Sequence, residues 1–456
     1  MCMFRKASRY IGETEPELIV GLDLGTSKIT VVVAERDING DGAQIIGVGQ
    51  APSSGIRKGM IVNLDQAVRS VKQAVSDAQN MVGQEIKEVT VSFGGGEVTN
   101  IRSKGMVSLG RVARPVMSLD IERVIEAAQA DVAVPANQSI LHTIPVEYSL
   151  DGNAGIDDPL GMTAMRLDIQ LQSVIVPSST IQNIMNCVDK AGLDVIGLVL
   201  KPLSSALGVL SPEESLAGAV VIDIGGGTTS VAVYSNGRPK HLGVVSIGGD
   251  HISNDVGSVL KLPLNKAEEI KKEISILAPP EDNEETVDFV SNDRDYSVAK
   301  IDLYEIIKCR LEELFDILVR PEIKCADVAM LPAGIILTGG VSKTEGIDGF
   351  LLDLMDLPTR VSLPVDETRM PPGRNTQEYS SAAGIIRYIL ERERDPFKYL
   401  DNSLSIKNIP ENMDGRTLVP EPLIKIRNNK KPLGDKREGD LFDLIQGIKK
   451  MFSELF

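Results

Sequence analysis

The chain has 456 residues, which is long enough for two or more domains, and its composition is that of an ordinary globular protein. Its formal net charge of −16 argues against general binding to nucleic acid, because the phosphate backbone would repel it. The four cysteines have the spacing of neither metal ligands nor a disulfide framework, and no apolar run is long enough to cross a bilayer, so we expect a cytoplasmic protein.

Residues 1–17 are predicted to be a flexible leader without a secretion signal, and a hairpin follows. An apolar strand run at 18–20 leads into the string Gly-Leu-Asp-Leu-Gly-Thr-Ser at 21–27, which holds Asp23 and a glycine turn, and a second strand run follows at 29–33. Glycines let backbone N–H groups approach an anion closely, and hydroxyl groups add donors, so the turn is typical of a phosphate loop. A carboxylate beside phosphate needs a cation between them, and Mg²⁺ held through water meets that need at Asp23.

The next segments predict a helix and then an insertion. Residues 65–81 have a helical apolar stripe, with Asp65 as a plausible cap. Residues 86–166 are interpreted as a small inserted α+β subdomain with a strand at 98–107 and a helix at 118–131. The strand at 168–177 is expected to return to the main fold, and a helix at 179–191 to follow it.

A second hairpin has the same order of apolar strand, aspartate, glycine turn and second strand as the first, 200 residues later. Strands are predicted at 219–222 and 231–234, with Asp223 and a Gly-Gly-Gly-Thr-Thr turn between them. A single hairpin of this kind is usually only a turn, but two copies indicate two related half-folds whose loops face each other across one Mg²⁺–triphosphate. The buried strand at 335–338 ends in Gly339 and Gly340, where a flat base can lie against bare backbone.

Residues 261–335 are interpreted as a second insertion, between the second hairpin and this glycine pair. We expect a helix at 266–277 capped by Asn265, an acidic loop at 279–295 and a single helix at 300–319.

The C-terminal region predicts a linker and an amphipathic helix. In the linker, residues 397–438, the stretch 416–437 holds seven basic residues against two acidic ones. Wound as a helix, residues 439–456 place their large apolar side chains on one face: Leu441, Phe442, Leu444, Ile445, Ile448, Met451, Phe452, Leu455 and Phe456. A basic linker before such a helix favours an anionic membrane surface, the alternative being that the helix docks on its own domain.

With both hairpins, the glycine pair and the tail in hand, the chain resembles the actin, sugar kinase and heat-shock chaperone ATPases, and within them the FtsA family of bacterial cell-division actin homologues. The specific features are the insertion with its Ile-Leu-His-Thr-Ile-Pro string at 140–145, the Ala-Glu-Glu-Ile-Lys string at 267–271, and the tail. The resemblance implies a two-lobed α/β fold. Its first-lobe core would be 18–85, 167–205 and 380–396, and its second-lobe core 206–260 and 336–379.

The same resemblance implies residue roles around ATP and Mg²⁺. The phosphate loops would be formed by Gly25, Thr26, Ser27 and Lys28 and by Gly225, Gly226, Gly227, Thr228 and Thr229. The remaining roles would be a water-held Mg²⁺ at Asp23 and Asp223, ribose contacts by Glu268 and Lys271, and adenine contacts by Gly339 and Gly340.

The resemblance also implies partners. The C-terminal peptide of the tubulin homologue FtsZ would bind near Arg310 and Glu313, for which an ordinary surface ion pair is the alternative. The other implied partners are further copies of the chain in head-to-tail filaments, anionic membrane lipids and later division proteins. Nucleic acid is not expected as a partner. The protein would tether the division ring at the cytoplasmic face of the membrane.

One departure bears on hydrolysis. Where this group commonly has a glutamate before the second hairpin, the chain has Lys201, and a protonated lysine cannot orient a hydrolytic water as a carboxylate does. We therefore expect ATP binding with at most weak ATPase activity. The competing interpretations are a pilus-assembly actin homologue, a small-molecule kinase and a chaperone-type ATPase, although no kinase base and no chaperone-size substrate domain are found.

Overall fold

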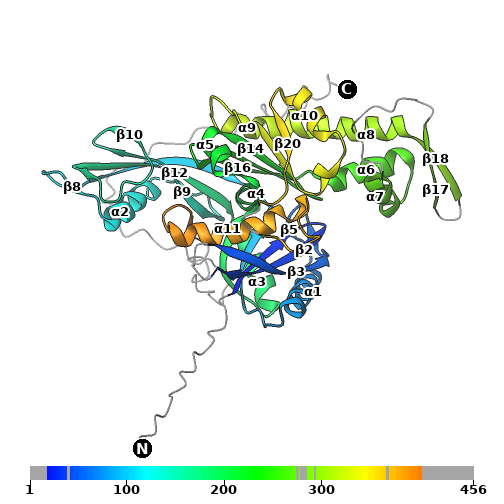
Figure 1. The fold of residues 1–456 in the computed structure, drawn as a ribbon, viewed down its shortest axis with the longest axis horizontal. Helices are drawn as coiled ribbons and strands as arrows, with labels where there is room; N and C mark the ends of the chain where they lie inside the picture. The colour runs from blue at the N-terminus through cyan, green and yellow to red at the C-terminus, as the bar shows by residue number, and fades with distance from the viewer. Residues whose placement is uncertain are drawn as a thin grey trace, which may run out of the picture. The chain divides into compact units, whose positions relative to one another are not determined.

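The computed structural model describes residues 18–37, 42–273, 277, 285–291, 294–365 and 369–402. Its first lobe is built on a sheet in the order β13-β6-β1-β2-β3 (Figure 1). The strands are β1 (Leu18–Leu24), β2 (Lys28–Arg36), β3 (Ala43–Pro52), β6 (Glu88–Phe93) and β13 (Asp194–Leu200). The predicted first hairpin is confirmed, because β1 and β2 pair antiparallel on either side of residues 25–27.

The second lobe repeats this arrangement in the order β20-β19-β14-β15-β16. Its strands are β14 (Ala219–Ile224), β15 (Thr229–Ser235), β16 (Arg238–Val245), β19 (Ile335–Thr338) and β20 (Thr359–Val361). In both lobes an antiparallel three-strand meander begins with the strand that carries the aspartate, and a parallel strand lies on that strand's other side. The prediction of two related half-folds is therefore confirmed.

Helices cover both faces of the first-lobe sheet, which explains its almost unbroken apolar strands. Short strands β4 (Ile56–Arg57) and β5 (Met60–Ile61) lead into α1 (Leu64–Val82), which packs on β2 and β3 and contacts α3 (Ser178–Lys190). The N-cap of α1 is Asn63, whose side chain accepts from the N–H of Gln66, so the predicted cap at Asp65 was two residues late.

Two helices cross between the lobes. Helix α4 (Lys201–Val209) follows β13 of the first lobe and packs on β14, β15 and β16 of the second, whereas α11 (Ser380–Arg394) packs on β1, β2 and β6 of the first (Figure 1). Their backbones approach so closely that a Cβ at Gly384 would lie 1.7 Å from the carbonyl oxygen of Ser204, and one at Gly208 would lie 2.0 Å from that of Ser380. Only glycine fits at these two positions.

The insertion begins later and ends later than predicted. Strand β6 lies in the first-lobe sheet between β1 and β13, so the insertion does not start at residue 86. Strand β12 (Arg166–Pro177), which we expected in the main fold, pairs with β7 (Thr99–Ser108) and β9 (Gln138–Leu150) in a separate sheet that also holds β10 (Asn153–Ile156). Part of β9 and the C-terminal part of β12 contribute apolar side chains to the first-lobe core, among them Leu141 and Val174. This apolar pattern is why the sequence predicted β12 as a strand of the main fold.

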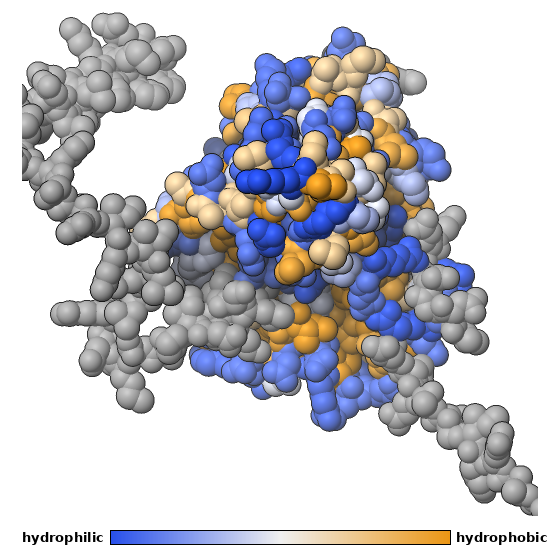
Figure 2. Space-filling model, turned by 90° about the vertical axis from the view of Figure 1, so that its left-hand side faces the viewer, coloured by the Kyte–Doolittle hydropathy of each residue, from blue (hydrophilic) through white to orange (hydrophobic). Residues whose placement is uncertain are grey.

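The rest of the insertion matches its prediction. Helix α2 (Ser118–Gln129) packs on β7 and β12, and β8 (Arg114–Pro115) pairs with β11 (Thr163–Ala164). Figure 2 shows this end of the molecule with apolar side chains scattered among polar ones. The large exposed apolar residues of the insertion include Met106, Val112, Met117, Leu119, Leu160 and Met162.

The second insertion differs from prediction in two places. Helix α6 (Gly249–Leu260) is followed by α7 (Leu264–Glu273), which already contains Asn265, the predicted cap. The acidic stretch predicted as loop holds a hairpin of β17 (Thr286–Ser291) and β18 (Arg294–Ala299), whose pairing overrides the charged composition.

The predicted helix at 300–319 contains a change of helical type. It runs as α8 (Lys300–Glu312), becomes a π-helix over Glu313–Val319, and continues as α9 (Arg320–Cys325). The buried side chains of the π segment are Leu314, Phe315 and Val319, whereas Leu318 is half-buried. Short elements complete the second lobe: α5 (Pro212–Ala217), η2 (Gly340–Lys343), α10 (Ile347–Met355) and η4 (Gln377–Tyr379).

The start of the predicted linker belongs to the fold. Strand β21 (Leu400–Asp401) pairs with β9, and Tyr399 is fully buried beside Tyr388. The leader at 1–17, the linker beyond residue 402 and the predicted membrane helix at 439–456 lie outside the described residues.

Candidate nucleotide-binding site

A cavity of about 440 Å³ lies where the aspartate strands of the two lobes end. Its lining includes the residues that the sequence analysis placed around the nucleotide, namely Asp23, Gly25, Thr26, Ser27, Lys28, Asp223, Gly225, Gly226, Thr228, Glu268, Lys271, Gly339 and Gly340. Two predicted residues do not line it. Gly227 packs against Thr26, and Thr229 is buried with its hydroxyl donated to the carbonyl oxygen of Ile247 at 2.8 Å.

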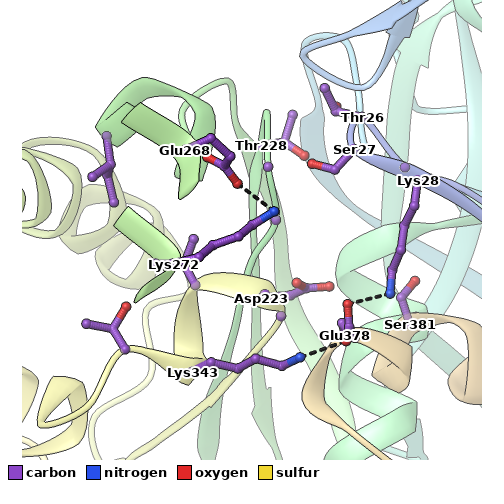
Figure 3. Close-up of a pocket in the computed structure, with 18 of the residues that line it drawn as sticks. Thr26, Ser27, Lys28, Asp223, Thr228, Glu268, Lys272, Lys343, Glu378 and Ser381 are labelled. Carbon is purple, nitrogen blue, oxygen red and sulfur yellow. Dashed lines mark hydrogen bonds and ion pairs between the residues drawn. The ribbon is translucent and has the colours of Figure 1, made fainter. Parts of the chain in front are cut away.

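The tips of the two predicted phosphate loops meet face to face. A Cβ at Gly226 would lie 1.9 Å from Oγ of Ser27, and one at Gly227 would lie 2.7 Å from the side chain of Thr26. In Figure 3 Thr26 and Ser27 lie opposite Thr228. Glycine leaves the backbone bare at these points, and the hydroxyl residues Thr26, Ser27 and Thr228 line the same cavity, which is the composition of an anion-binding cradle.

Gly339 forms the third wall next to Asp223. Strand β19 lies parallel to β14, with Thr338 in register with Asp223, so the chain leaves the sheet beside the second loop. Gly339 has a φ of 89°, and a Cβ there would lie 2.3 Å from Oδ1 of Asp223. A side chain is excluded by both the backbone conformation and the space, which leaves a flat surface as predicted for a base.

Lys28 is tied into an ionic bridge that the sequence did not indicate. Its Nζ lies 2.6 Å from Oε2 of Glu378, and Nζ of Lys343 lies 2.7 Å from Oε1 of the same carboxylate. Figure 3 shows Glu378 held between the two lysines. Burial favours the neutral acid, but hydrogen bonds and charge from Lys28 and Lys343 outweigh it and lower the pKa of Glu378 to about 2. The carboxylate is therefore ionised, and Lys28 is positioned from β2 at the mouth of the first loop.

Glu268 forms a similar cluster on α7. Its carboxylate lies 2.6 Å from Nζ of Lys271 and 3.0 Å from Nζ of Lys272, and it accepts a short hydrogen bond from Ser253. Lys271 also donates to the carbonyl oxygen of Gly249 at 2.9 Å. Burial opposes ionisation, but the donors outweigh it and lower the pKa of Glu268. The pair is oriented at the cavity edge, where the family's ribose contacts were expected.

Lys201 is the contact that bears most directly on the predicted metal. Its Nζ lies 2.8 Å from Oδ1 and 3.0 Å from Oδ2 of Asp23. Asp223 accepts from Oγ of Ser205 at 2.6 Å, and its pKa is raised by burial, with the charge of Lys201 opposing the shift. Because both oxygens of Asp23 already contact an ammonium group, the residues present do not fit a Mg²⁺ ion held between Asp23 and Asp223. Within the described part of the chain there is also no cluster of three or more His, Cys, Asp or Glu side chains that could hold a metal directly.

Sequence reasoning missed several lining residues, most of which come from segments without a motif, while Lys272 and Val341 directly follow predicted residues. The missed residues are Ile252, Lys272, Ile307, Val341, Lys343, Thr344, Glu378 and Ser381. The available signal was the charge of two residues: Lys343, which follows Gly339 and Gly340 closely, and Glu378, which shortly precedes α11.

The predicted partner residues are engaged within the domain. Arg310 forms a two-pronged pair with Asp255 of α6, with N–O distances of 2.6 and 2.9 Å, and it also contacts Glu313 on its own helix. Arg310 therefore has a structural partner in addition to its predicted role. No helix among the described residues has the length and apolarity to cross a bilayer.

Two sequence models of one family match the chain. The model described as "Cell division protein FtsA" matches residues 220–384, and that described as "SHS2 domain inserted in FTSA" matches residues 95–175. The second match starts after β6 and ends within β12, in agreement with the insertion in the structure.

Relatives that match the chain over most of their length are named cell division protein FtsA. The chain is 36% identical to cell division protein FtsA of Pseudomonas aeruginosa over 383 residues, which are 83% of this chain and 91% of that protein. It is 31% identical to FtsA of Bacillus subtilis over 381 residues, 83% of this chain and 84% of that protein.

Solved structures with much lower identity share the fold. The chain resembles a PilM–PilN type IV pilus biogenesis complex with a TM-score of 0.58 and 18% identity, covering 82% of this chain and 98% of that one. It resembles MreB5 of Spiroplasma citri bound to ADP with a TM-score of 0.50 and 16% identity, covering 84% of this chain and 100% of that one. These likenesses concern the fold alone, and with the family matches they confirm the predicted actin-like fold with its insertion.

Proposed function

The chain belongs to the FtsA family of cell division proteins, and on that premise we propose that it is an ATP-binding, polymerising adaptor that tethers the FtsZ division ring to the inner face of the membrane. The observation that carries the proposal is the pair of facing loops, in which Gly226 and Gly227 lie directly against Ser27 and Thr26 at the edge of one cavity lined by both loops. A cavity between two lobes responds to a ligand that contacts both, because such a ligand stabilises the closed arrangement.

ATP is the proposed cofactor. Its phosphates would lie between the two loops with Lys28 at their edge, its ribose beside Glu268 and Lys271, and its base against Gly339 and Gly340. The neighbouring structure of MreB5 was solved with ADP, which is consistent with a nucleotide in this fold. The Mg²⁺ ion that the sequence predicted at Asp23 and Asp223 is not part of this proposal, because the contact between Lys201 and Asp23 does not fit it.

Weak hydrolysis follows from the same geometry. Lys201 lies where we expected a carboxylate to orient the attacking water, and an ammonium group cannot accept a proton. We therefore propose that ATP acts as a structural ligand that sets the lobe arrangement, with at most slow turnover.

Polymerisation would convert this arrangement into a scaffold. Two-lobed chains that associate head to tail form open filaments, since the contact is heterologous. The exposed apolar side chains of the insertion, among them Met117 at the N-cap of α2 and Leu119 in its first turn, offer surface for such a contact.

The tail would supply membrane attachment. One amphipathic helix of residues 439–456 binds an anionic surface weakly, whereas a filament presents many such helices and binds strongly by avidity. The FtsZ C-terminal peptide would bind near Arg310 and Glu313, and later division proteins would join the assembled filament. The resulting location is the cytoplasmic face of the membrane at the division site.

Among the alternatives, the family match favours the division protein over a pilus-assembly homologue, because likeness to the pilus complex concerns only the fold. A small-molecule kinase would need a carboxylate base facing a second substrate. The carboxylates that line the described cavity, those of Asp23, Glu268 and Glu378, are in ion pairs, and that of Asp223 accepts from Ser205.

The proposal is tested by reconstituting the full chain with ATP, anionic vesicles and FtsZ. We expect filaments on the vesicles by electron microscopy and recruitment of FtsZ in co-sedimentation, both reduced when ATP is withdrawn. Vesicles that carry no filaments under any nucleotide condition, and that recruit no FtsZ, would contradict it.

A further inference from the structure

Lys201 lies half-buried between the lobes and its charged end lines the nucleotide cavity. It is the first residue of α4, and its stem is confined by the backbone after β6, since a Cβ at Gly94 would lie 2.9 Å from that of Lys201. From this position its Nζ contacts both oxygens of Asp23, from a segment 178 residues away in the sequence. Close packing of the stem fixes the direction of the ammonium group.

The place of this lysine in α4 makes its charge unfavourable without an acidic partner. The N-terminus of a helix carries a partial positive charge, so a cation is normally disfavoured there. Burial also lowers the pKa of Lys201, but the carboxylates of Asp23 and Asp223 raise it by more, and the net pKa is raised. The ammonium group is held in place by its two contacts with Asp23, at 2.8 and 3.0 Å, one of the two aspartates that the sequence assigned to a metal ion.

A metal ion in such a site reduces the repulsion between carboxylates and phosphates, and an ammonium group can have the same effect. The carboxylates of Asp23 and Asp223 both line the cavity, and they would repel the phosphates of a nucleotide unless a cation lay between them. Lys201 lines the same cavity and contacts the first of these carboxylates. A covalently attached cation is present at every metal concentration, so its effect is not lost when the metal is removed.

We propose that the Lys201 ammonium group is the built-in cation of the nucleotide site, pairing with Asp23 and so reducing the negative charge of Asp23 and Asp223 in place of a metal ion, and that the cleft therefore binds nucleoside triphosphates without Mg²⁺. This inference rests on the proposed nucleotide-binding function of the same cavity and adds to it the source of the positive charge. It differs from the prediction of a water-held Mg²⁺ in one measurable respect, the metal dependence of affinity.

The experiment is a titration of the full chain with ATP, once in Mg²⁺ and once in EDTA. For the wild-type chain we expect dissociation constants within about threefold of each other in the two buffers. Lys201→Met keeps the length of the stem but removes its charge, and we expect its affinity to fall roughly tenfold or more in EDTA, with partial rescue by Mg²⁺. Lys201→Arg should retain binding in EDTA, and Lys72→Met, an exposed lysine on α1, should behave as the wild type.

The outcomes separate the two proposals. If the wild type binds ATP in Mg²⁺ but loses roughly tenfold or more in EDTA, the built-in cation is rejected while nucleotide binding stands. If it binds in neither buffer, both are rejected. A Lys201→Met chain that is folded by circular dichroism and binds as the wild type in EDTA also overturns the role of Lys201, and the wild-type comparison decides the question even if that variant does not fold.

Discussion

The Nζ atom of Lys201 at the start of α4 lies 2.8 Å from Oδ1 of Asp23 near the end of β1. The contact joins the first lobe sheet to the helix that crosses to the second lobe. The other ion pairs of the cavity follow the same scheme, with Glu268 facing Lys271 and Glu378 facing Lys28. Before a nucleotide arrives, the lysines are thus held by carboxylates in position, and an incoming phosphate competes for charges that are already oriented.

Gly339→Ala is expected to weaken ATP binding. The added Cβ would lie 2.3 Å from Oδ1 of Asp223 in a backbone conformation with φ of 89°, so the loop must move or the residue is strained by about 1–3 kcal/mol. Thermal unfolding and ATP titration of the full chain measure both effects. Gly349→Ala is the matched control, because no atom lies within 4 Å of its Cβ and the residue is inside α10. Equal ATP affinity of the two variants would contradict the placement of Gly339 at the base.

Glu378→Gln is expected to remove an acid-sensitive part of the stability. The pKa of Glu378 in the folded chain is about 2, against an ordinary value of 4.5. A depressed pKa contributes stability that is present above pH 4.5 and is lost as the pH falls toward 2. Urea unfolding between these values should show a steeper loss for the wild type than for Glu378→Gln. Parallel pH profiles of the two chains would show that the bridge to Lys28 and Lys343 is not formed.

His142 is expected to make the folded chain less stable in mild acid. It is fully buried, its Nε2 accepts from the N–H of Leu200 at 3.1 Å, and burial lowers its pKa from 6.5 to about 4. Between those two values the unfolded chain binds a proton that the folded chain does not, so stability falls as the pH drops, by roughly 3 kcal/mol at most. His142→Gln keeps an acceptor for Leu200 and does not titrate. If its free energy of unfolding changes with pH as the wild type's does, another group is responsible.

The ion pair of Arg310 allows its partner role to be separated from its structural role. Arg310→Ala removes both the pair with Asp255 and the contact with Glu313. We expect Arg310→Ala and Glu313→Ala to weaken binding of the FtsZ C-terminal peptide. Asp255→Ala, which breaks the same internal pair but leaves the arginine, should retain peptide binding. Fluorescence anisotropy with labelled peptide measures this, and equal losses in all three variants would mean that the pair only stabilises the fold.

Removal of residues 439–456 is expected to abolish flotation of the chain with anionic vesicles. The proposed helix would bury an apolar face at the lipid surface, and the basic residues before it would add electrostatic attraction that salt weakens. Flotation of the intact and shortened chains with vesicles of anionic and of neutral lipid measures both contributions. Equal flotation of the two chains would contradict tethering by the tail.

The parts of the fold that the sequence predicted are those fixed by local chemistry. The two hairpins were predictable because Asp23 and Asp223 each follow an apolar strand and precede a glycine turn, and the helix beginning near Asn63 because its stripe is regular. The hairpin at β17 and β18 was missed because cross-strand pairing overrode its charged composition.

The lysine contacts of the site were not predictable, because they depend on tertiary structure. Glu378 meets Lys28 from a segment 350 residues away, and Lys201 meets Asp23 from a helix whose own motif suggests a departure from the family but not a contact. The position of β12 was wrong for a related reason, since its apolar pattern suits both the first-lobe core and the sheet of the insertion.

Calorimetric titration of the full chain with ATP tests most directly the claim that the two facing loops hold one nucleotide. The account predicts saturable binding of one ATP per chain, competed by ADP. It also predicts that binding is weakened in Gly226→Ala, whose Cβ would lie 1.9 Å from Oγ of Ser27 and would force that hydroxyl to move. A folded chain that releases no heat and does not bind labelled ATP, or a Gly226→Ala chain that binds as the wild type does, would contradict it.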